Sequence, residues 1–224
     1  MLKVDIINLG TIGVEPAHTI LENCKWEIVE GKTYILLGSN GSGKTTFSFA
    51  LTGLTRSPFE VKGSVFFRGK DLLNCNADEL LQIRKKKIKY VFQDPVSSFD
   101  PLKRFGYYFK MLEIPEEKID SLLDFFLLPE YSRIKRLFPH EISVGMAQRI
   151  AICLAFLPSP DLVIMDEPNS ALDAASGNLL VQKIKEFTGS GSSVLIITQD
   201  LNFANNLNGD KYIIKEKKIL PFKQ

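Results

Sequence analysis

Apolar positions recur along the chain with two spacings, and each spacing predicts a different kind of strand. Residues 2–9, 26–29 and 61–67 alternate apolar and polar side chains, which predicts strands buried on one face. Residues 34–37, 162–165 and 194–197 are continuously apolar, as in strands buried on both faces of a parallel sheet. Residues 90–92 predict another short strand, and residues 211–220 predict a terminal hairpin.

Helix-length segments lie between these strands. Residues 47–51, 76–89 and 176–187 are predicted helices, with Asn76 as the cap of the second. From residue 102 to 157 no strand pattern occurs, and helical segments are separated by prolines at 115, 129 and 139.

The pattern as a whole predicts an α/β fold: a parallel sheet core, an antiparallel β flank and an α-helical insertion. We expect a single domain over residues 1–224. In it, residues 1–94 and 157–224 form the core with its flank, and residues 95–156 form the helical subdomain.

Composition excludes several classes of protein. The 224 residues are 45% hydrophobic and 24% charged, as in ordinary globular proteins. A net charge of +2 is too small for a nucleic-acid footprint, so no nucleic-acid partner is expected. No apolar run reaches the length of a membrane span, so any membrane association is expected to come through a partner. The basic run at residues 84–89 reads as a solvated helix face.

A glycine-rich loop follows the apolar strand at residues 34–37. Its residues are Gly38, Ser39, Asn40, Gly41, Ser42, Gly43, Lys44, Thr45 and Thr46. Glycines let successive backbone N–H groups turn inward as an anion nest, and the following helix adds a partial positive charge. Lys44 would then reach the β- and γ-phosphates of a nucleotide, and the Thr45 hydroxyl would bind Mg²⁺. The alternative, a glycine-rich turn that matches by chance, is disfavoured by the flanking strand and helix.

Two carboxylates end the buried strand at residues 162–165. Ligands of parallel α/β sheets bind at the carboxyl ends of the strands, where Asp166 and Glu167 stand. Beside a phosphate loop, Asp166 suits a magnesium ligand and Glu167 a general base for an attacking water. A helix cap or a surface pair is the alternative.

The order of these motifs resembles that of the ATP-binding subunits of ABC transporters over nearly the whole chain. Residues 38–46 resemble the Walker A motif and residues 164–167 the end of Walker B. Gln93 matches the Q-loop glutamine, which binds magnesium, and residues 170–173 match the D-loop. Residues 142–146, with Ser143 and Gly145, occupy the place of the signature motif. The resemblance implies a RecA-like P-loop NTPase fold, with ATP and Mg²⁺ as ligands and ATP hydrolysis as the activity.

Two longer stretches resemble one subfamily. Residues 91–101 and 138–143 are similar to the importers of oligopeptides, dipeptides and nickel. The resemblance implies two membrane permease subunits, an extracytoplasmic substrate-binding protein and a peripheral place on the cytoplasmic face of the cell membrane. Because the chain ends soon after its last hairpin, nickel or metal-chelate uptake is slightly favoured over peptides. His18 has no partner in the sequence and is expected to be a surface residue.

Three departures from the family pattern bear on activity. Val144 replaces the first signature glycine, and Gln199 stands at the switch histidine, where it can still hydrogen-bond a phosphate or water. No aromatic residue stands between Asn8 and Leu21, where the family stacks adenine.

Family members act as dimers in which each ATP is enclosed by one subunit's Walker motifs and the other's signature. Nickel and peptide importers usually pair two different ATP-binding subunits, so the resemblance implies a second, different subunit as partner, although a homodimer stays open. The rival hypothesis is a nucleotide-binding partner with little turnover. A soluble ABC ATPase would bring a coiled coil or tandem cassettes, and a GTPase a guanine-recognition motif; the sequence contains neither.

Overall fold

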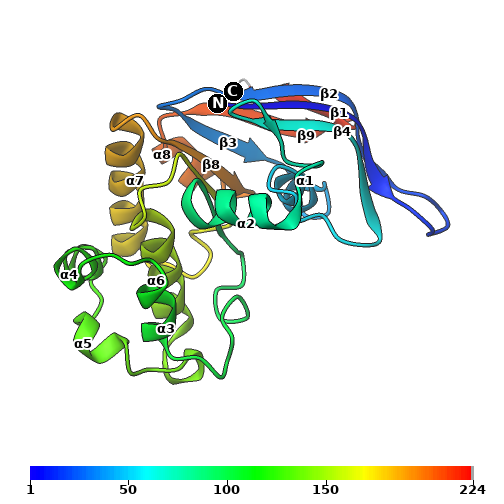
Figure 1. Ribbon diagram of the computed structural model, residues 1–224. Coiled ribbons are helices and arrows are strands. Elements are labelled where there is room, and N and C mark those ends of the chain that lie inside the picture. Colours follow the sequence, from blue (N-terminus) through cyan, green and yellow to red (C-terminus); the bar gives the residue numbers. More distant parts are fainter. Residues whose placement is uncertain (223–224) are drawn as a thin grey trace.

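Two β-sheets and a group of helices build the molecule (Figure 1). The computed structural model describes residues 1–222. The larger sheet has six strands in the order β10-β9-β3-β8-β7-β6, and all are parallel except β10. Their bounds are β3 Thr33–Leu37, β6 Ile88–Val91, β7 Leu162–Asp166, β8 Ser193–Thr198, β9 Asp210–Lys215 and β10 Lys218–Pro221.

The smaller sheet is antiparallel, with four strands in the order β2-β1-β4-β5. Its strands are β1 Leu2–Thr11, β2 Thr19–Ile28, β4 Phe59–Phe67 and β5 Lys70–Asp71. Strand β2 meets the edge of the larger sheet, where the Glu22 backbone N–H donates to the Lys217 carbonyl at 2.9 Å. The predicted β flank is therefore attached to the core through β10.

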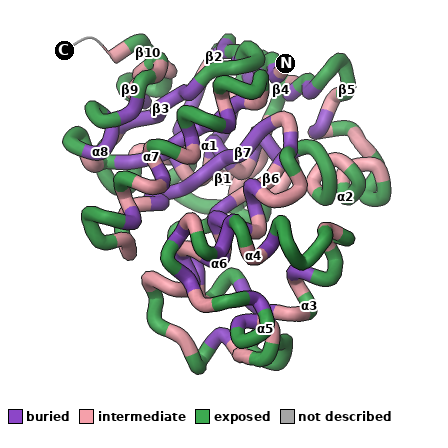
Figure 2. Tube along the Cα trace, turned by 90° about the vertical axis from the view of Figure 1, so that its left-hand side faces the viewer, coloured by how far each residue is buried: buried purple, intermediate pink, exposed green. Residues whose placement is uncertain are grey.

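Alternation along the central strands separates two hydrophobic cores. In β3, Tyr34 and Leu36 face the core between the two sheets, where Trp26 and Phe47 also lie. The intervening Ile35 and Leu37 face the other core, which the helices share. All five residues of β3 are buried, and buried segments run through the middle of the molecule in Figure 2.

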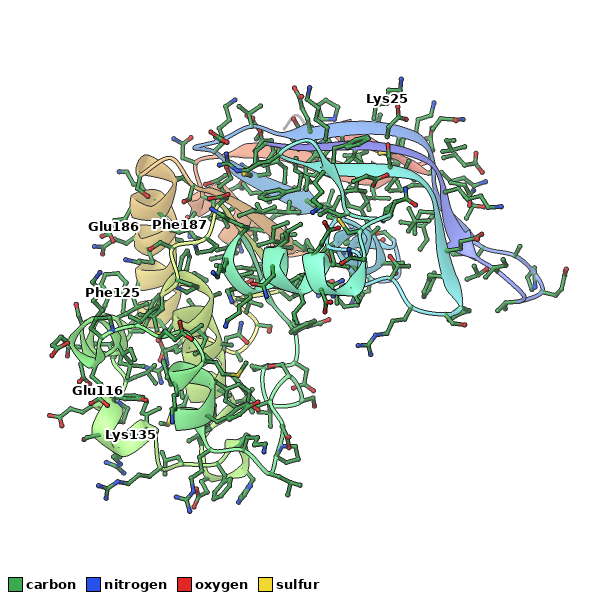
Figure 3. All side chains as sticks on the ribbon, in the orientation of Figure 1. Lys25, Glu116, Phe125, Lys135, Glu186 and Phe187 are labelled. Atoms are coloured by element: carbon green, nitrogen blue, oxygen red, sulfur yellow. The ribbon has the colours of Figure 1, made fainter. Side chains whose placement is uncertain are left out.

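The helices cover the larger sheet and extend to one side of it (Figure 1). They are α1 Lys44–Ala50, α2 Ala77–Lys86, α3 Phe105–Lys110, α4 Glu116–Phe125, α5 Tyr131–Ile134, a 3-10 turn at Pro139–Glu141, α6 Val144–Phe156, α7 Ala174–Gly189 and α8 Leu201–Asn206. Helices α3 to α6 gather below the sheet in this view, and their outer surface includes the Glu116–Lys135 ion pair (Figure 3). No helix among the described residues is both long and apolar enough to cross a membrane.

Three details of the structure correct the sequence-based predictions. Helix α2 ends at Lys86 rather than at residue 89, because Ile88 already pairs with Leu162 in the parallel sheet. The basic run is not a fully solvated face, since Arg84 donates to the Thr52 and Gly53 carbonyls behind α1. Helix α8 was not predicted, although Asp200 caps it through two backbone N–H groups.

Candidate functional site

The phosphate loop connects the buried strand β3 to helix α1. Gly43 caps α1 with a φ of 91°, a conformation that side chains with a Cβ resist. A Cβ at Gly43 would also overlap the Ile20 side chain of β2, so the loop packs directly on the antiparallel flank. The path of residues 38–46 is therefore set by packing against β2 and by the start of helix α1.

Lys44 is the buried cation of this loop. Its side chain turns back, and its Nζ donates to the Gly38 carbonyl at 2.7 Å and to the Ser39 carbonyl at 2.9 Å. Burial lowers the pKa of Lys44, while the charges of Glu167 and Asp166 act in the opposite direction. The ammonium group therefore already stands over the loop, within electrostatic reach of both carboxylates.

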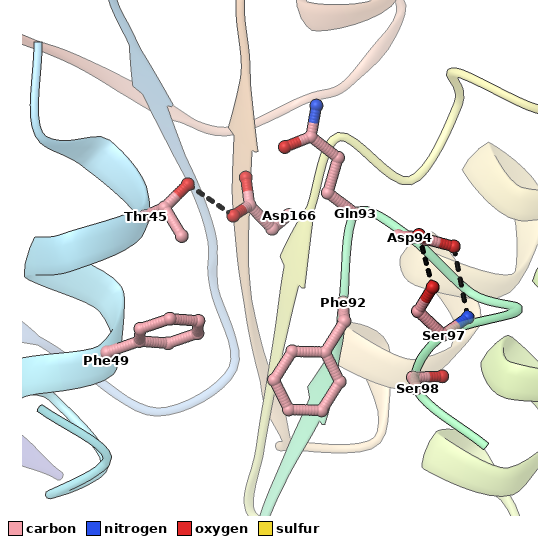
Figure 4. Close-up of a pocket in the computed structure, with 8 residues that line it drawn as sticks. All are labelled: Thr45, Phe49, Phe92, Gln93, Asp94, Ser97, Ser98 and Asp166. Carbon is pink, nitrogen blue, oxygen red and sulfur yellow. Dashed lines mark hydrogen bonds between the residues drawn. The ribbon is translucent and has the colours of Figure 1, made fainter. Parts of the chain in front are cut away.

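Asp166 ends strand β7 directly opposite the start of α1. The Thr45 hydroxyl donates to Asp166 Oδ2 at 2.5 Å (Figure 4). Burial raises the pKa of Asp166, and the Thr45 hydrogen bond and the Lys44 charge counteract it. Gln93 follows β6 and lines the same cavity as Thr45 and Asp166, so the three predicted magnesium ligands face one space.

Glu167 lies beyond the end of β7 and is held by the neighbouring strand β8. Its Oε2 accepts a hydrogen bond from the Thr198 hydroxyl at 2.9 Å, and its Oε1 accepts one from the Gln199 backbone N–H at 3.0 Å. Glu167 is 8% exposed and has a positive φ of 45°. The predicted general base and Gln199 are thus neighbours, and their contact is made by the backbone of Gln199.

The signature residues lie apart from this cluster. Ser143 caps α6, where its Oγ accepts a hydrogen bond from the Met146 N–H at 3.2 Å. Val144 follows at the surface, 53% exposed. A Cβ at Gly145 would lie 3.0 Å from the Ala171 carbonyl, so this glycine permits close packing against the loop before α7. Neither Ser143 nor Gly145 lines the described cavities around Thr45 and Asp166.

Three residues that the sequence reasoning did not assign to the site, His18, Ile20 and Phe59, also line the phosphate-loop cavity, which has a volume of about 440 Å³. His18 is exposed as expected, yet it stands beside Gly41 and Gly43. Phe59 comes from the start of β4, whose pairing with Thr11 of β1 brings its ring to the same cavity. The alternation of residues 61–67 signalled this strand, but its pairing partner was not evident from the sequence.

These residues fit a magnesium–triphosphate group. Ser42 Oγ, in the middle of the loop, is buried and has no hydrogen-bond partner in the described part of the chain. The donors around the cavity are a hydroxyl, a carboxylate and an amide oxygen, the hard oxygen ligands that Mg²⁺ prefers beside substrate phosphates. Within residues 1–222 no cluster of three or more His, Cys, Asp or Glu could hold a metal ion by itself.

Fold and site together define a P-loop nucleotide-binding protein with a parallel α/β core. A family model described as "ABC transporter" matches residues 21–170. The chain therefore belongs to the ABC transporter family.

Individual relatives agree with this assignment. The oligopeptide transport ATP-binding protein OppD of Haemophilus influenzae is 35% identical over 199 residues, which are 82% of this chain and 60% of that protein. The OppD protein of Escherichia coli is 34% identical over 196 residues, covering 82% and 57%. The chain thus spans about 60% of the length of these relatives. The resemblance to the oligopeptide importer subfamily is confirmed.

Solved structures confirm the predicted fold class. A dimeric structure of a bacterial ABC transporter cassette aligns over 100% of both chains with a TM-score of 0.85 and 25% identity. A second dimeric structure of that ATP-binding cassette, bound to ADP and Pi in a post-hydrolysis state, gives a TM-score of 0.84 at 25% identity. It covers 100% of this chain and 98% of that one.

Proposed function

We propose that this chain is the ATP-hydrolysing subunit of an ABC importer of small peptides. One observation supports this proposal above the others. Lys44, Thr45, Asp166 and Glu167 converge at the carboxyl ends of neighbouring parallel strands in a chain of this family. Phosphoryl transfer uses a carboxylate, a cationic side chain and a hydroxyl group close together, and this edge of the sheet provides all three.

Binding of the nucleotide is assigned to the loop and its surroundings. Backbone N–H groups of residues 38–46 and the Lys44 ammonium would hold the phosphates, with Lys44 exchanging its two carbonyl contacts for phosphate oxygens. Thr45, Gln93 and Asp166 would hold Mg²⁺, which neutralises charge on the β- and γ-phosphates. His18 and Phe59 supply a ring surface beside the loop, where the first strand region offers no aromatic residue for adenine.

Hydrolysis is assigned to Glu167 as general base. A carboxylate must accept a hydrogen bond from the attacking water, whereas both Glu167 oxygens now accept bonds from Thr198 and Gln199. Each carboxylate oxygen has a second lone pair, so Glu167 can accept a hydrogen bond from the water while it keeps both of these contacts. The Gln199 amide is exposed and free of the Glu167 contact, so it can hydrogen-bond the γ-phosphate or the water.

Completion of the site is assigned to a second subunit. Ser143 and Gly145 lie on the surface part of α6, away from the chain's own phosphate loop, as expected if they approach the ATP of another chain. Val144 puts a branched side chain at that contact. We propose a heterodimer, because a different partner would supply an unaltered signature to this chain's ATP.

The transport partners are proposed by analogy with the family. Two membrane permease subunits and an extracytoplasmic substrate-binding protein would complete the transporter, with this chain peripheral on the cytoplasmic face. Residues 95–156 would act as the helical subdomain that transmits closure of the dimer to the permease. Peptides are proposed as the solute because the reported relatives are oligopeptide transport proteins. The expectation of nickel or metal-chelate uptake stays an untested prediction.

Steady-state ATP hydrolysis by the purified chain, measured across a range of protein concentrations with Mg²⁺, tests the proposal. A rate that rises more steeply than linearly indicates dimerisation of this chain. A rate that appears only when a second ATP-binding subunit is added indicates the heterodimer. Absence of hydrolysis under both conditions, with ATP binding intact, would overturn the assignment as a hydrolase.

The second candidate is a nucleotide-binding partner with little turnover. Gln199, which cannot carry a proton as a histidine can, and Val144 in place of the signature glycine favour it. In a reconstituted pair of subunits, Glu167→Gln in this chain alone distinguishes the two functions. If this chain is the importer ATPase, the pair loses the ATP hydrolysis that occurs at this chain's site. If the chain only binds nucleotide, the hydrolysis rate of the pair does not change.

A further inference from the structure

Tyr90 places a hydroxyl group behind the metal-binding face of Asp166. It belongs to β6, which pairs in parallel with β7, the strand that Asp166 ends. The Tyr90 hydroxyl lies 3.5 Å from Asp166 Oδ2, the same oxygen that accepts the Thr45 hydrogen bond. It also lies 2.7 Å from Ser48 Oγ on the next turn of α1. Nothing in the chemistry assigned above uses Tyr90 or Ser48.

The direction of these hydrogen bonds follows from a count of hydrogens. Ser48 and Tyr90 have one hydroxyl hydrogen each, while the neighbouring acceptors are the Thr45 carbonyl, the other hydroxyl and Asp166. If Ser48 donates to Thr45, Tyr90 donates to Ser48 and turns a lone pair toward the carboxylate. If Ser48 donates to Tyr90, Tyr90 donates to Asp166. The negative charge of an ionised Asp166 favours the second arrangement, in which Ser48 gives up its 2.8 Å hydrogen bond to the Thr45 carbonyl.

Aromatic neighbours fix the position of this hydroxyl. The Tyr90 ring centroid lies 5.3 Å from that of Phe49 on α1 and 4.7 Å from that of Phe92. Phe92 directly precedes Gln93, so the same packing sets where the glutamine leaves β6 (Figure 4). The Phe49 and Phe92 rings, whose centroids lie 6.1 Å apart, pack together against Tyr90 and limit its orientation, with its hydroxyl near Ser48 and Asp166.

Electrostatics are consistent with a donor at this place. Burial raises the pKa of Tyr90 above its ordinary value, so the hydroxyl keeps its hydrogen at neutral pH. Burial also raises the pKa of Asp166, and the Tyr90 hydrogen bond is one of the contacts that favour the ionised carboxylate.

We infer that Tyr90, anchored by Ser48, is a positioning residue that orients Asp166 for magnesium. Thr45 and Tyr90 both contact Oδ2, which leaves Oδ1 for the metal, and Asp166 and Gln93 line one cavity. The inference rests on the proposed role of Asp166. Removing the Tyr90 hydroxyl leaves the Thr45 hydrogen bond on Oδ2 but fixes the carboxylate less well, so metal-dependent binding weakens while metal-independent binding does not.

Calorimetric titration of ADP into the full chain tests this inference, once in EDTA and once with Mn²⁺ as the metal probe. The ratio of the two dissociation constants measures what the metal contributes. Tyr90→Phe keeps the ring and removes only the hydroxyl. It should leave the metal-free constant unchanged and weaken binding with Mn²⁺ by about 3- to 10-fold. Ser48→Ala should weaken it in the same way, and the double variant should not exceed Tyr90→Phe, because the two hydroxyls act as one unit.

Tyr108→Phe is the matched control, since it removes a tyrosine hydroxyl that contacts Asp100, and neither residue lines the cavities at Asp166. Melting temperatures of all variants show whether each one is folded. If Tyr90→Phe keeps the full contribution of Mn²⁺, the positioning role is wrong and the proposed function stands. If the wild-type chain gains nothing from Mn²⁺, the proposed magnesium site fails and the inference fails with it. Equal weakening with and without metal would assign Tyr90 to packing alone.

Discussion

The phosphate-loop region and the signature region differ in how completely their groups are paired within the chain. Lys44 is 6% exposed and contacts two carbonyls, and Asp166 and Glu167 both accept hydrogen bonds. In the signature region Val144 is 53% exposed, and Ser143 uses its side chain only to begin a helix. One region is therefore assembled within this chain, and the other presents a surface.

The physical reason lies in the cost of burying charge. Two carboxylates and an ammonium can be buried together only where hydrogen bonds and opposite charges compensate them, so they need the fixed ends of β3, β7 and β8. A helix N-terminus needs no such support, since its free N–H groups and its cap can remain in water. The exposed region can therefore approach another molecule without rearranging the core.

The largest expected effect concerns the buried region. Glu167→Gln should lower ATP hydrolysis by at least about 100-fold, because an amide cannot accept the proton of the attacking water. Nucleotide binding should persist, since Gln retains the shape and an acceptor for Thr198. Steady-state hydrolysis and ATP titration measure the two quantities. Glu186→Gln on the exposed face of α7 is the matched control and should retain full activity.

Retention of more than a tenth of the activity in Glu167→Gln would show that another group acts as the base. The buried region would then be a binding site without the assigned chemistry. The two regions would in that case differ in how their side chains are buried and paired, but not in catalytic role.

A smaller effect is expected in the exposed region. Ser143→Asp keeps an efficient helix cap but places a carboxylate where a second chain's triphosphate would approach. Like-charge repulsion should lower hydrolysis by about 10-fold or more in any active dimer, while ATP binding by the isolated chain stays unchanged. Ser143→Thr, which keeps both cap and hydroxyl, is the control. A loss of ATP binding in the isolated chain would show that Ser143 serves its own phosphate loop.

Val144→Gly tests whether the branched side chain limits turnover. Removing it lets backbone approach a nucleotide more closely, and hydrolysis by the chain alone should rise by about 3- to 10-fold. Val144→Ala separates the effect of the branch from that of a glycine in the first helical turn. Brisk hydrolysis by isolated Val144→Gly would argue against the need for a different partner, whereas an unchanged rate would assign the low turnover to Gln199.

Sequence reasoning succeeded where the signal is local. Continuous apolar runs marked β3, β7 and β8, and the residues directly after them fixed the positions of Lys44 and Asp166. Asn76 was predicted as a cap and accepts the Glu79 N–H at 2.9 Å. In each case a few adjacent residues determine the backbone conformation.

Contacts between distant segments were not predictable in the same way. Phe59 reaches the phosphate loop because β4 pairs with β1, and Tyr90 reaches Asp166 because β6 pairs with β7. The residues 84–89 read as one basic face, yet a helix end and a strand start divide them. Strand pairing across the fold decides these contacts, and one sequence does not contain that pairing as a local pattern.

The smallest expected effect is on the pH dependence of the melting temperature. It compares an aspartate of the buried region with an aspartate beside the exposed region. Burial raises the pKa of Asp166 in the folded chain, so the folded state favours the neutral acid and loses stability as pH rises through that pKa. Asp166→Asn is neutral throughout. Without nucleotide or metal, its melting temperature should exceed that of the wild type by about 2–4 °C at pH 7.5, and the difference should shrink toward pH 4.

Asp173, which caps α7 beside the exposed region, should behave in the opposite way. Hydrogen bonds from Ser176 lower its pKa, so the ionised form stabilises the fold above the ordinary aspartate pKa and this stability is lost as pH falls. Asp173→Asn should therefore melt slightly below the wild type at pH 7.5 and approach it at pH 4. Differential scanning calorimetry at several pH values measures both variants. If both differences have the same sign, the destabilisation assigned to the ionised, buried Asp166 is absent and the two regions do not differ in this respect.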